Sequence, residues 1–376
     1  MALEHSWDRR ARTAASRGRS VLGVVVVGVL TLAGAVGADA GATLRPMSVT
    51  AAAAAAGAGV RPVAPADRLI ARPWLARRAD GTWLTGRTGR ATALGRHEVG
   101  LAVGNGWLIT ADDRSLGDSI TSRRVDGSGG RTTAIDVIPA SVAIAGSTAY
   151  IGGFDRATSG DPGLDAIDLG GGGVRELIRS SKGAHPRSVV AAPDGSAIVS
   201  ATCDGAGTCD LTAVTAVGAV PAVAASTVSA PGYLRGTTST VAVVGPDPAS
   251  WIAGIDLASG RALWRHDALE MWAGYTTIDG RLLQAELRET ANGPTFTVQA
   301  VATATGATTT LMTAAVGHGI GLWPELSSDD AFAIGPAYSL EDALARADGS
   351  PITVRLFAVA DGRELGTVSI DGSGDR

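Results

Sequence analysis

Two cysteines are the most reactive side chains in this sequence, and their spacing limits the chemistry available to them. Cys203 and Cys209 flank the loop Asp204–Thr208. In an oxidising compartment such a pair predicts a hairpin disulfide, whose closure would stabilise the fold by about 2 kcal/mol. The alternative is a metal-binding or redox-active pair, although a redox motif would have the closer Cys-x-x-Cys spacing. We therefore expect a structural disulfide.

Three histidines form the second candidate group. His97, His185 and His318 each precede the first strand of a repeat described below. A closed ring of such repeats would bring these equivalent positions to one mouth of its central channel. Three imidazoles there could hold a divalent metal, or bind an anionic ligand when protonated. The competing interpretation is three ordinary loop residues on one surface, so we treat them as candidate ligand-binding residues and assign no metal. His266 is given no role.

Other patterns that could indicate catalysis have simpler explanations. Asp329-Asp330 could bind calcium or act in acid–base chemistry, but the pair aligns with Pro193-Asp194-Gly195 of another repeat and so predicts a tight turn. The glycine run 170–173 has no following lysine or helix, which argues against a phosphate loop. No Gly-x-Ser-x-Gly or His-Glu-x-x-His motif is present. The sequence therefore assigns no catalytic residue and no cofactor, and it favours a protein that is not an enzyme.

The first forty residues predict export. Five arginines precede an uncharged, apolar run over residues 21–38, and Ala38-Asp39-Ala40 matches a cleavage pattern. Residues 1–40 are therefore a predicted signal peptide. The alternative is an uncleaved signal anchor, because the apolar run could span a bilayer and tether the protein to it. In both cases the remainder lies outside the cytoplasm, either secreted or at the cell surface.

The composition of the remaining chain limits its partners. Residues 41–66 are rich in Ala, Gly and Pro with almost no charge, which indicates a linker. The formal net charge of −4 argues against nucleic acid as a partner. The partner expected is an extracellular ligand or protein that the sequence does not identify.

A repeat of about 45 residues organises the rest of the chain. An apolar strand leads into a glycine turn and a second short strand, as in Leu164–Leu169 followed by Gly172, and in Trp251–Leu257 followed by Gly260. Glycine suits these hairpins because a tight turn requires a positive φ angle. The turn glycines are spaced by 46, 45, 46, 42, 46 and 56 residues, at Gly81, Gly127, Gly172, Gly218, Gly260, Gly306 and Gly362. The long last interval predicts an inserted segment, Tyr338–Gly349, with a short helix over 339–345.

Further strand pairs fill each interval. Ser188–Ala192 and Ala197–Ala201, for example, are joined by the turn Pro193-Asp194-Gly195. Four short antiparallel strands per repeat are typical of a β-propeller blade. We therefore predict an all-β fold, a β-propeller of seven four-stranded antiparallel blades over residues 67–372, followed by a tail at 373–376. The first unit is incomplete because only linker precedes Arg68, so six full blades plus a hairpin is the alternative.

The same residues resemble the superfamily of bacterial exported β-propellers, which includes WD-like and quinoprotein-like repeats. The segment Gly254–Trp264 is similar to the tryptophan-docking repeat of quinoprotein dehydrogenases, because Asp256, Gly260 and Trp264 match its spacing. In that family the motif packs one blade against the next and is not catalytic. The resemblance implies the fold and leaves the activity open.

Three functions follow as hypotheses. The leading one is a non-enzymatic extracytoplasmic propeller that binds or scaffolds a ligand, glycan or protein through loops at one channel mouth. The alternative is a hydrolase or lyase with a site in the central funnel, assembled from several blades. The third is a quinoprotein-like oxidoreductase.

Overall fold

The fold is described from a computed structural model of the chain. It covers residues 73–370 except 79–80, 88–89, 115–117, 159, 180–184, 216–221, 247–250, 268–273, 317–318 and 348–349. The predicted signal segment 1–40, the linker 41–66 and the tail 373–376 lie outside the described residues.

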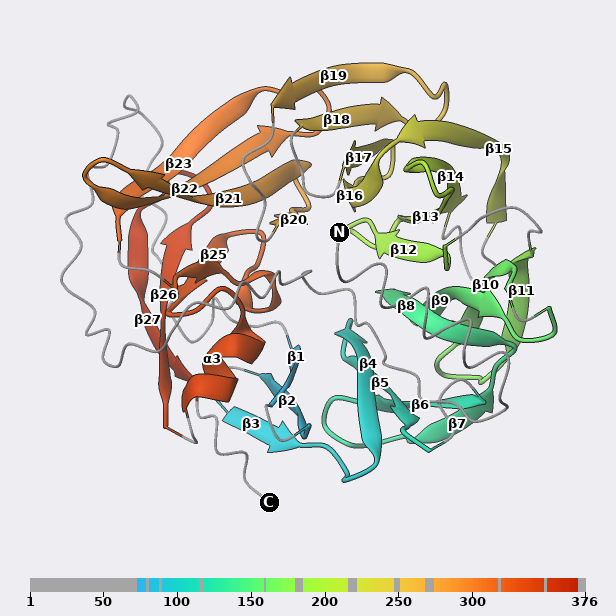
Figure 1. The fold of residues 1–376 in the computed structure, drawn as a ribbon. Helices are drawn as coiled ribbons and strands as arrows, with labels where there is room; N and C mark the ends of the chain where they lie inside the picture. The colour runs from blue at the N-terminus through green and yellow to red at the C-terminus, as the bar shows by residue number, and fades with distance from the viewer. Residues whose placement is uncertain are drawn as a thin grey trace.

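Seven antiparallel sheets are arranged in a ring, which makes the protein a seven-bladed β-propeller (Figure 1). Blade 1 consists of β1 (Trp74–Arg77), β2 (Trp83–Arg87) and β3 (Arg90–Ala93). Blade 2 consists of β4 (Glu98–Gly104), β5 (Trp107–Asp112), β6 (Ser119–Arg124) and β7 (Arg131–Ala134). Blade 3 consists of β8 (Val137–Ala145), β9 (Thr148–Asp155), β10 (Pro162–Asp168) and β11 (Val174–Arg179). Blade 4 consists of β12 (Ser188–Ala191), β13 (Ala197–Cys203), β14 (Thr208–Thr215) and β15 (Ala222–Pro231).

The remaining three blades follow the same plan. Blade 5 consists of β16 (Tyr233–Thr237), β17 (Val241–Gly245), β18 (Trp251–Asp256) and β19 (Ala262–Asp267). Blade 6 consists of β20 (Gly274–Thr276), β21 (Arg281–Thr290), β22 (Gly293–Ala302) and β23 (Thr308–Ala315). Blade 7 consists of β24 (Gly321–Leu322), the 3-10 turn η1 (Pro324–Leu326), β25 (Ala331–Gly335), the helix α3 (Leu340–Ala347), β26 (Ile352–Ala358) and β27 (Glu364–Ile370). Strand order in every sheet follows chain order, with the first strand nearest the centre of the ring (Figure 1).

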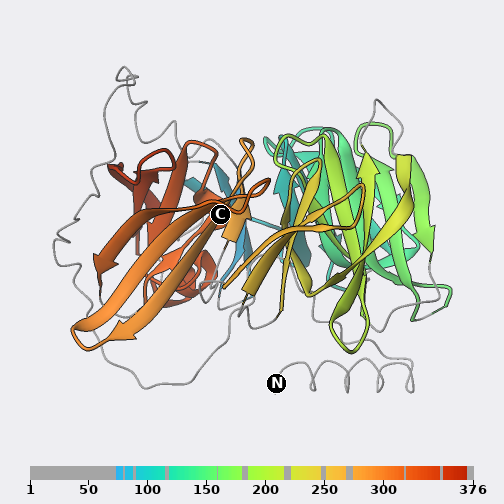
Figure 2. The same ribbon diagram turned by 90° about the horizontal axis from the view of Figure 1, so that it is seen from above.

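The core lies between the blades, because each sheet buries both of its faces. Strand β8 alternates strictly between buried and partly buried residues, as expected for a pleated strand with period two. Ile109 of blade 2 and Ile151 of blade 3 belong to one buried cluster, and Tyr150 of blade 3 and Ile198 of blade 4 belong to another. Seen from the side, the strands run between the two faces of the disc (Figure 2).

The repeat predicted from the turn glycines is confirmed for five blades, with one correction at Gly81, while Gly218 lies outside the described residues. Gly127, Gly172, Gly260, Gly306 and Gly362 all have positive φ in the hairpin between the third and fourth strands of blades 2, 3, 5, 6 and 7. Gly81 also has a positive φ, of 86°, in a hairpin turn. Its hairpin, however, joins β1 and β2, the first two described strands of blade 1. The turn glycines of blades 2, 3, 5, 6 and 7 instead lie in the hairpin before the last strand. Blade 1 has three described strands, and the residues before Pro73 lie outside the described part of the chain, so the predicted incompleteness of the first unit stays a prediction.

Blade 7 contacts blade 1 through the predicted insertion. Within the described residues, no sheet combines strands from both ends of the chain. Instead, Leu340 and Leu344 of α3 pack in one buried cluster with Trp74 of β1 and Leu326 of η1. The Ser339 hydroxyl accepts a hydrogen bond from the N–H of Asp342 and caps the helix. The segment predicted as an insertion therefore joins the ends of the ring.

The docking role implied for Trp264 agrees with its contacts. Its indole Nε1 donates to the carbonyl of Thr303 in blade 6 at 2.6 Å. His266 stacks on this indole with ring centres 5.3 Å apart, and its imidazole hydrogen-bonds to the carbonyl of Gly306. His266, which received no role from the sequence, therefore helps to dock blade 5 on blade 6.

Candidate functional site

One face of the ring carries most of the candidate residues. In blade 4 the turn 193–196 between β12 and β13 lies on one face, so the turn 204–207 and the connection 231–233 to blade 5 lie on the opposite face. We call this opposite face the loop face. His97 and His185 lie on it because each immediately precedes the first strand of a blade. Helix α3 lies on it as well, because it connects the second and third strands of blade 7.

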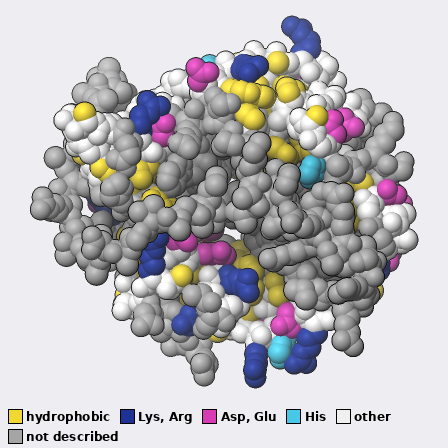
Figure 3. Space-filling view, in the orientation of Figure 1, with side chains coloured by type: hydrophobic (Ala, Val, Ile, Leu, Met, Phe, Trp, Pro, Cys, Tyr) yellow, Lys and Arg dark blue, Asp and Glu magenta, His cyan; other side chains and the backbone are white. Residues whose placement is uncertain are grey.

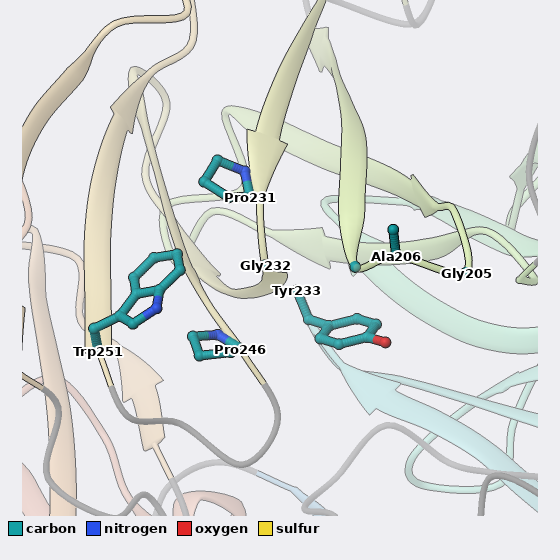
Figure 4. A pocket seen from close by; sticks show the side chains of 8 residues that line it. Gly205, Ala206, Pro231, Gly232, Tyr233, Pro246 and Trp251 are labelled. Atoms are coloured by element: carbon teal, nitrogen blue, oxygen red, sulfur yellow. The ribbon is translucent and has the colours of Figure 1, made fainter.

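A cavity of about 340 Å³ opens on the loop face between blades 4 and 5 (Figure 4). The turn after β13 forms one wall, the connection from β15 to β16 forms the floor, and the ends of β17 and β18 form the other wall. The lining residues are small, cyclic or aromatic: Gly205, Ala206, Gly207, Pro231, Gly232, Tyr233, Pro246 and Trp251. None of these eight residues is charged, so this lining suits a neutral ligand.

Trp251 is the largest side chain that lines the cavity. Its indole is partly exposed, and the guanidinium of Arg265 lies 4.3 Å from the ring centre on one side. This cation–π contact fixes the orientation of the indole and occupies one of its two faces. The indole also packs against the buried cluster between blades 4 and 5, and part of it lines the cavity. In Figure 4 the ring of Pro246 lies between those of Trp251 and Tyr233, and the Tyr233 ring lies on the side of Gly205 and Ala206.

The predicted disulfide is present and fixes one wall of the cavity. Cys203 and Cys209 are bonded, with their Cα atoms 3.9 Å apart. Inside the loop, Asp204 Oδ1 accepts hydrogen bonds from the N–H groups of Ala206 and Thr208, both at 2.9 Å. The N–H of Gly232 donates to the carbonyl of Gly207 at 2.8 Å, which joins this wall to the floor.

Replacing both cysteines by serine is expected to lower the free energy of unfolding by about 2 kcal/mol, because the unfolded chain would regain the freedom of the closed loop. Urea denaturation of the wild type and of the Cys203→Ser/Cys209→Ser variant measures the difference. A reducing agent should destabilise the wild type by a similar amount and leave the variant unchanged. Equal stability of the two oxidised proteins would contradict a structural role for the bond.

The three predicted histidines have different surroundings. His97 Nδ1 lies 3.2 Å from Asp113 Oδ1, and His97 Nε2 lies 2.5 Å from Arg114 Nη2. His185 is partly exposed, and its backbone carbonyl accepts a hydrogen bond from Thr202 at 3.4 Å. His318 lies outside the described residues. Among the residues that the structure describes, no group of three His, Cys, Asp or Glu side chains could hold a metal ion.

The role of these histidines as a channel-mouth site stays a prediction. Seen along the ring axis, the molecule has a narrow central opening with acidic and basic side chains beside it (Figure 3).

The Asp329-Asp330 pair is confirmed as part of a tight turn, in which the N–H of Ser328 donates to the carbonyl of Ala331. Asp329 Oδ1 accepts from the N–H of Ile278 in blade 6 at 2.8 Å, so this carboxylate links two blades.

A pair of glutamates that the sequence did not indicate lies where blade 7 meets blade 1. Glu325 belongs to η1 and Glu341 to the first turn of α3. Burial, with a further contribution from the charge of Glu341, raises the pKa of Glu325 to about 7. Burial also raises the pKa of Glu341, whose Oε1 accepts from the N–H of Arg77 at 3.1 Å. Glu325 Oε2 is buried and has no hydrogen-bond partner among the described residues.

No local sequence signal marks these two glutamates. They are 16 residues apart, and one of them lies in the insertion. The only indication was the length of the last repeat interval, which predicted extra structure in blade 7 without saying what that structure contacts.

Comparisons with known proteins give a likeness in fold only. No protein-family model matches the chain, and no curated protein matches it. Among solved structures, hydrazine synthase of Kuenenia stuttgartiensis is 14% identical with a TM-score of 0.45, over 86% of this chain and 92% of that one. A functionally unknown protein from Desulfotomaculum acetoxidans DSM 771 is 12% identical with a TM-score of 0.49, over 81% and 96%. AztD of Citrobacter koseri is 10% identical with a TM-score of 0.44, over 79% and 86%.

None of the described helices is long and apolar enough to cross a membrane. The predicted tether at residues 21–38 lies outside the described residues. At identities this low, the likenesses concern the fold alone. The assignment as a seven-bladed β-propeller therefore rests on the sheet topology of this chain.

Proposed function

We propose that this chain is an extracytoplasmic binding propeller without catalytic activity, which holds a neutral saccharide in the loop-face cavity between blades 4 and 5. The observation that carries the proposal is the cavity itself, with an indole fixed by Arg265 and an uncharged lining. The disulfide and the predicted export signal support a location outside the cytoplasm.

The shape and chemistry of the cavity favour a saccharide. A sugar ring has an apolar C–H face that stacks on an aromatic ring, and hydroxyl groups that bond to backbone amides and carbonyls. The indole of Trp251 and the phenol of Tyr233 offer the aromatic surfaces, and the glycine turns bring backbone close to the ligand. A volume of about 340 Å³ lies at the small end of ligand cavities, which suits one or two sugar rings.

Trp251→Ala is expected to weaken saccharide binding at least ten-fold, because the stacking surface is lost. The experiment screens the purified exported protein on an array of neutral glycans and then measures the best ligand by isothermal titration calorimetry. Tyr233→Ala should weaken the same ligand. A matched control is Leu263→Ala, which removes a side chain that is 47% exposed on β19 and does not line the cavity.

Two results would reject the proposal. One is the absence of any neutral glycan that binds. The other is a ligand whose affinity Trp251→Ala and Leu263→Ala leave equally unchanged.

The Glu325–Glu341 pair favours a second candidate, a hydrolase or lyase. A carboxyl group with a pKa of about 7 holds and releases a proton near neutral pH, as a general acid–base catalyst must. Turnover of a glycoside or polysaccharide that Glu325→Gln abolishes while binding persists would establish this candidate. Turnover that Glu325→Gln leaves unchanged would reject it.

A further inference from the structure

A buried arginine without a counter-ion lies between blades 3 and 4. Arg187 is only 3% exposed, and it lies in the connection that leads into β12. Its Nη1 donates to the hydroxyl of Ser200 at 2.9 Å. Its Nε is buried and has no acceptor among the described residues. No carboxylate in the described part of the chain forms an ion pair with it.

Burial disfavours the charged form of this guanidinium. It lowers the pKa of Arg187 to about 10, and the charge of Asp210 offsets only part of that effect. Asp210 is exposed on β14, so it does not act as a buried counter-ion. A cation taken out of water is costly unless a partner compensates for the lost hydration. The chain therefore retains a charge for which its described residues offer no full partner.

Two buried hydroxyl side chains, Ser200 and Thr212, lie on the strands next to Arg187. Ser200 lies on the same face of β13 as Ile198, which packs against blade 3. Thr212 is buried opposite Ser200 on β14. Across the boundary, the Arg187 carbonyl comes so close to Gly152 that a Cβ atom there would lie 2.4 Å away. The absence of a side chain at Gly152 therefore leaves room in blade 3 for the backbone of Arg187.

We propose that Arg187 and Ser200 bind an oxyanion, the carboxylate or phosphate group of a ligand, at the loop-face end of the boundary between blades 3 and 4. Guanidinium groups hold such anions through two parallel N–H donors, and the Ser200 hydroxyl adds a third donor. Arg187 lies at this end of the boundary because it directly precedes β12, which begins at the loop face. The site is separate from the cavity between blades 4 and 5, and it stands whether or not that cavity binds a saccharide.

The test is a titration of thermal stability with sodium acetate, sodium phosphate and sodium chloride at matched ionic strength. We expect acetate or phosphate, and not chloride, to raise the melting temperature of the wild type along a saturable curve. Saturation by acetate alone would identify a carboxylate ligand, and saturation by phosphate alone would identify a phosphate ligand. Arg187→Gln should remove the saturable part.

The matched control is Arg131→Gln. This arginine is also hydrogen-bonded to a neutral acceptor, the Gly171 carbonyl, but it is exposed. The variant should keep the wild-type curve. If Arg187→Gln does not fold, Ser200→Ala carries the test, because it removes one donor and leaves the guanidinium, and it should weaken the anion several-fold. A wild type that responds alike to all three salts overturns the proposal. A saturable curve that Arg187→Gln leaves unchanged also overturns it. If Arg187→Gln does not fold, a saturable curve that Ser200→Ala leaves unchanged overturns it.

Discussion

Replacing Gly362 by alanine is expected to lower the free energy of unfolding by about 3 kcal/mol. Gly362 has φ of 71° in the turn between β26 and β27. A Cβ atom there would lie 1.8 Å from the carbonyl oxygen of Leu311 in β23. Because that oxygen belongs to the backbone of blade 6, the clash can be relieved only by moving one blade away from the other. Urea denaturation of Gly362→Ala measures the loss.

Gly127→Ala separates the two causes of this loss. Gly127 occupies the corresponding turn of blade 2 with φ of 85°, but a Cβ atom there would meet nothing within 4 Å. Only the backbone strain remains, so we expect a loss of about 1 kcal/mol. The difference between the two variants is then the cost of separating blades 6 and 7. Equal losses would show that the approach of Gly362 to Leu311 contributes nothing.

The sequence predicted the fold because the repeat is visible locally. Turn glycines, alternating strands and the turn at Pro193-Asp194-Gly195 are all signals between near neighbours in the chain. The seven blades and the helix in the insertion followed from them. The disulfide followed from the spacing of two cysteines and is confirmed.

The correction at Gly81 shows the limit of such spacing. Gly81 lies 46 residues before Gly127 and fits the repeat by number, yet its turn joins β1 to β2. A period in the sequence counts residues, whereas the position of a hairpin in a blade depends on how many strands precede it. Blade 1 has three described strands, so the glycine that fits the residue spacing lies in a different hairpin of the blade there.

The cavity could not be predicted for a different reason. Trp251 and Tyr233 begin strands, where an aromatic residue usually indicates packing in the core. Only the arrangement of two blades brings them to one opening beside the disulfide turn. Arg187 was overlooked for the same reason, because its burial and its lack of a counter-ion depend on what blade 3 places opposite it.

Glu325 is expected to make the free energy of unfolding fall as the pH rises. A carboxylate whose pKa is lowered on folding has the opposite effect. Its pKa rises from 4.5 to about 7 on folding, first through burial and further through Glu341. Between these two values the unfolded chain has released a proton that the folded chain keeps. The free energy of unfolding therefore falls as the pH rises through this range and levels off above it. The fall from this group is roughly 3 kcal/mol.

Glu325→Gln tests this dependence because glutamine has nearly the same shape and does not ionise. Its free energy of unfolding should match that of the wild type near pH 4 and exceed it by about 3 kcal/mol at pH 8. Urea denaturation of both proteins across this range measures the difference. The subtraction removes the titration of all other groups, provided that the substitution leaves their surroundings unchanged.

Glu341→Gln connects the effect to the closure of the ring. The glutamine oxygen can still accept the hydrogen bond from Arg77, while the negative charge beside Glu325 disappears. The pKa of Glu325 in the folded protein should then fall, so the loss of stability should level off at a lower pH than in the wild type and should be smaller in total. Glu325 in η1 and Glu341 in α3 both belong to the segment that packs against Trp74 of blade 1. Ionisation of Glu325 would therefore weaken the contact that joins the two ends of the chain. If the free energy of unfolding of Glu325→Gln still fell between pH 4 and pH 8 as much as that of the wild type, the fall would come from another group.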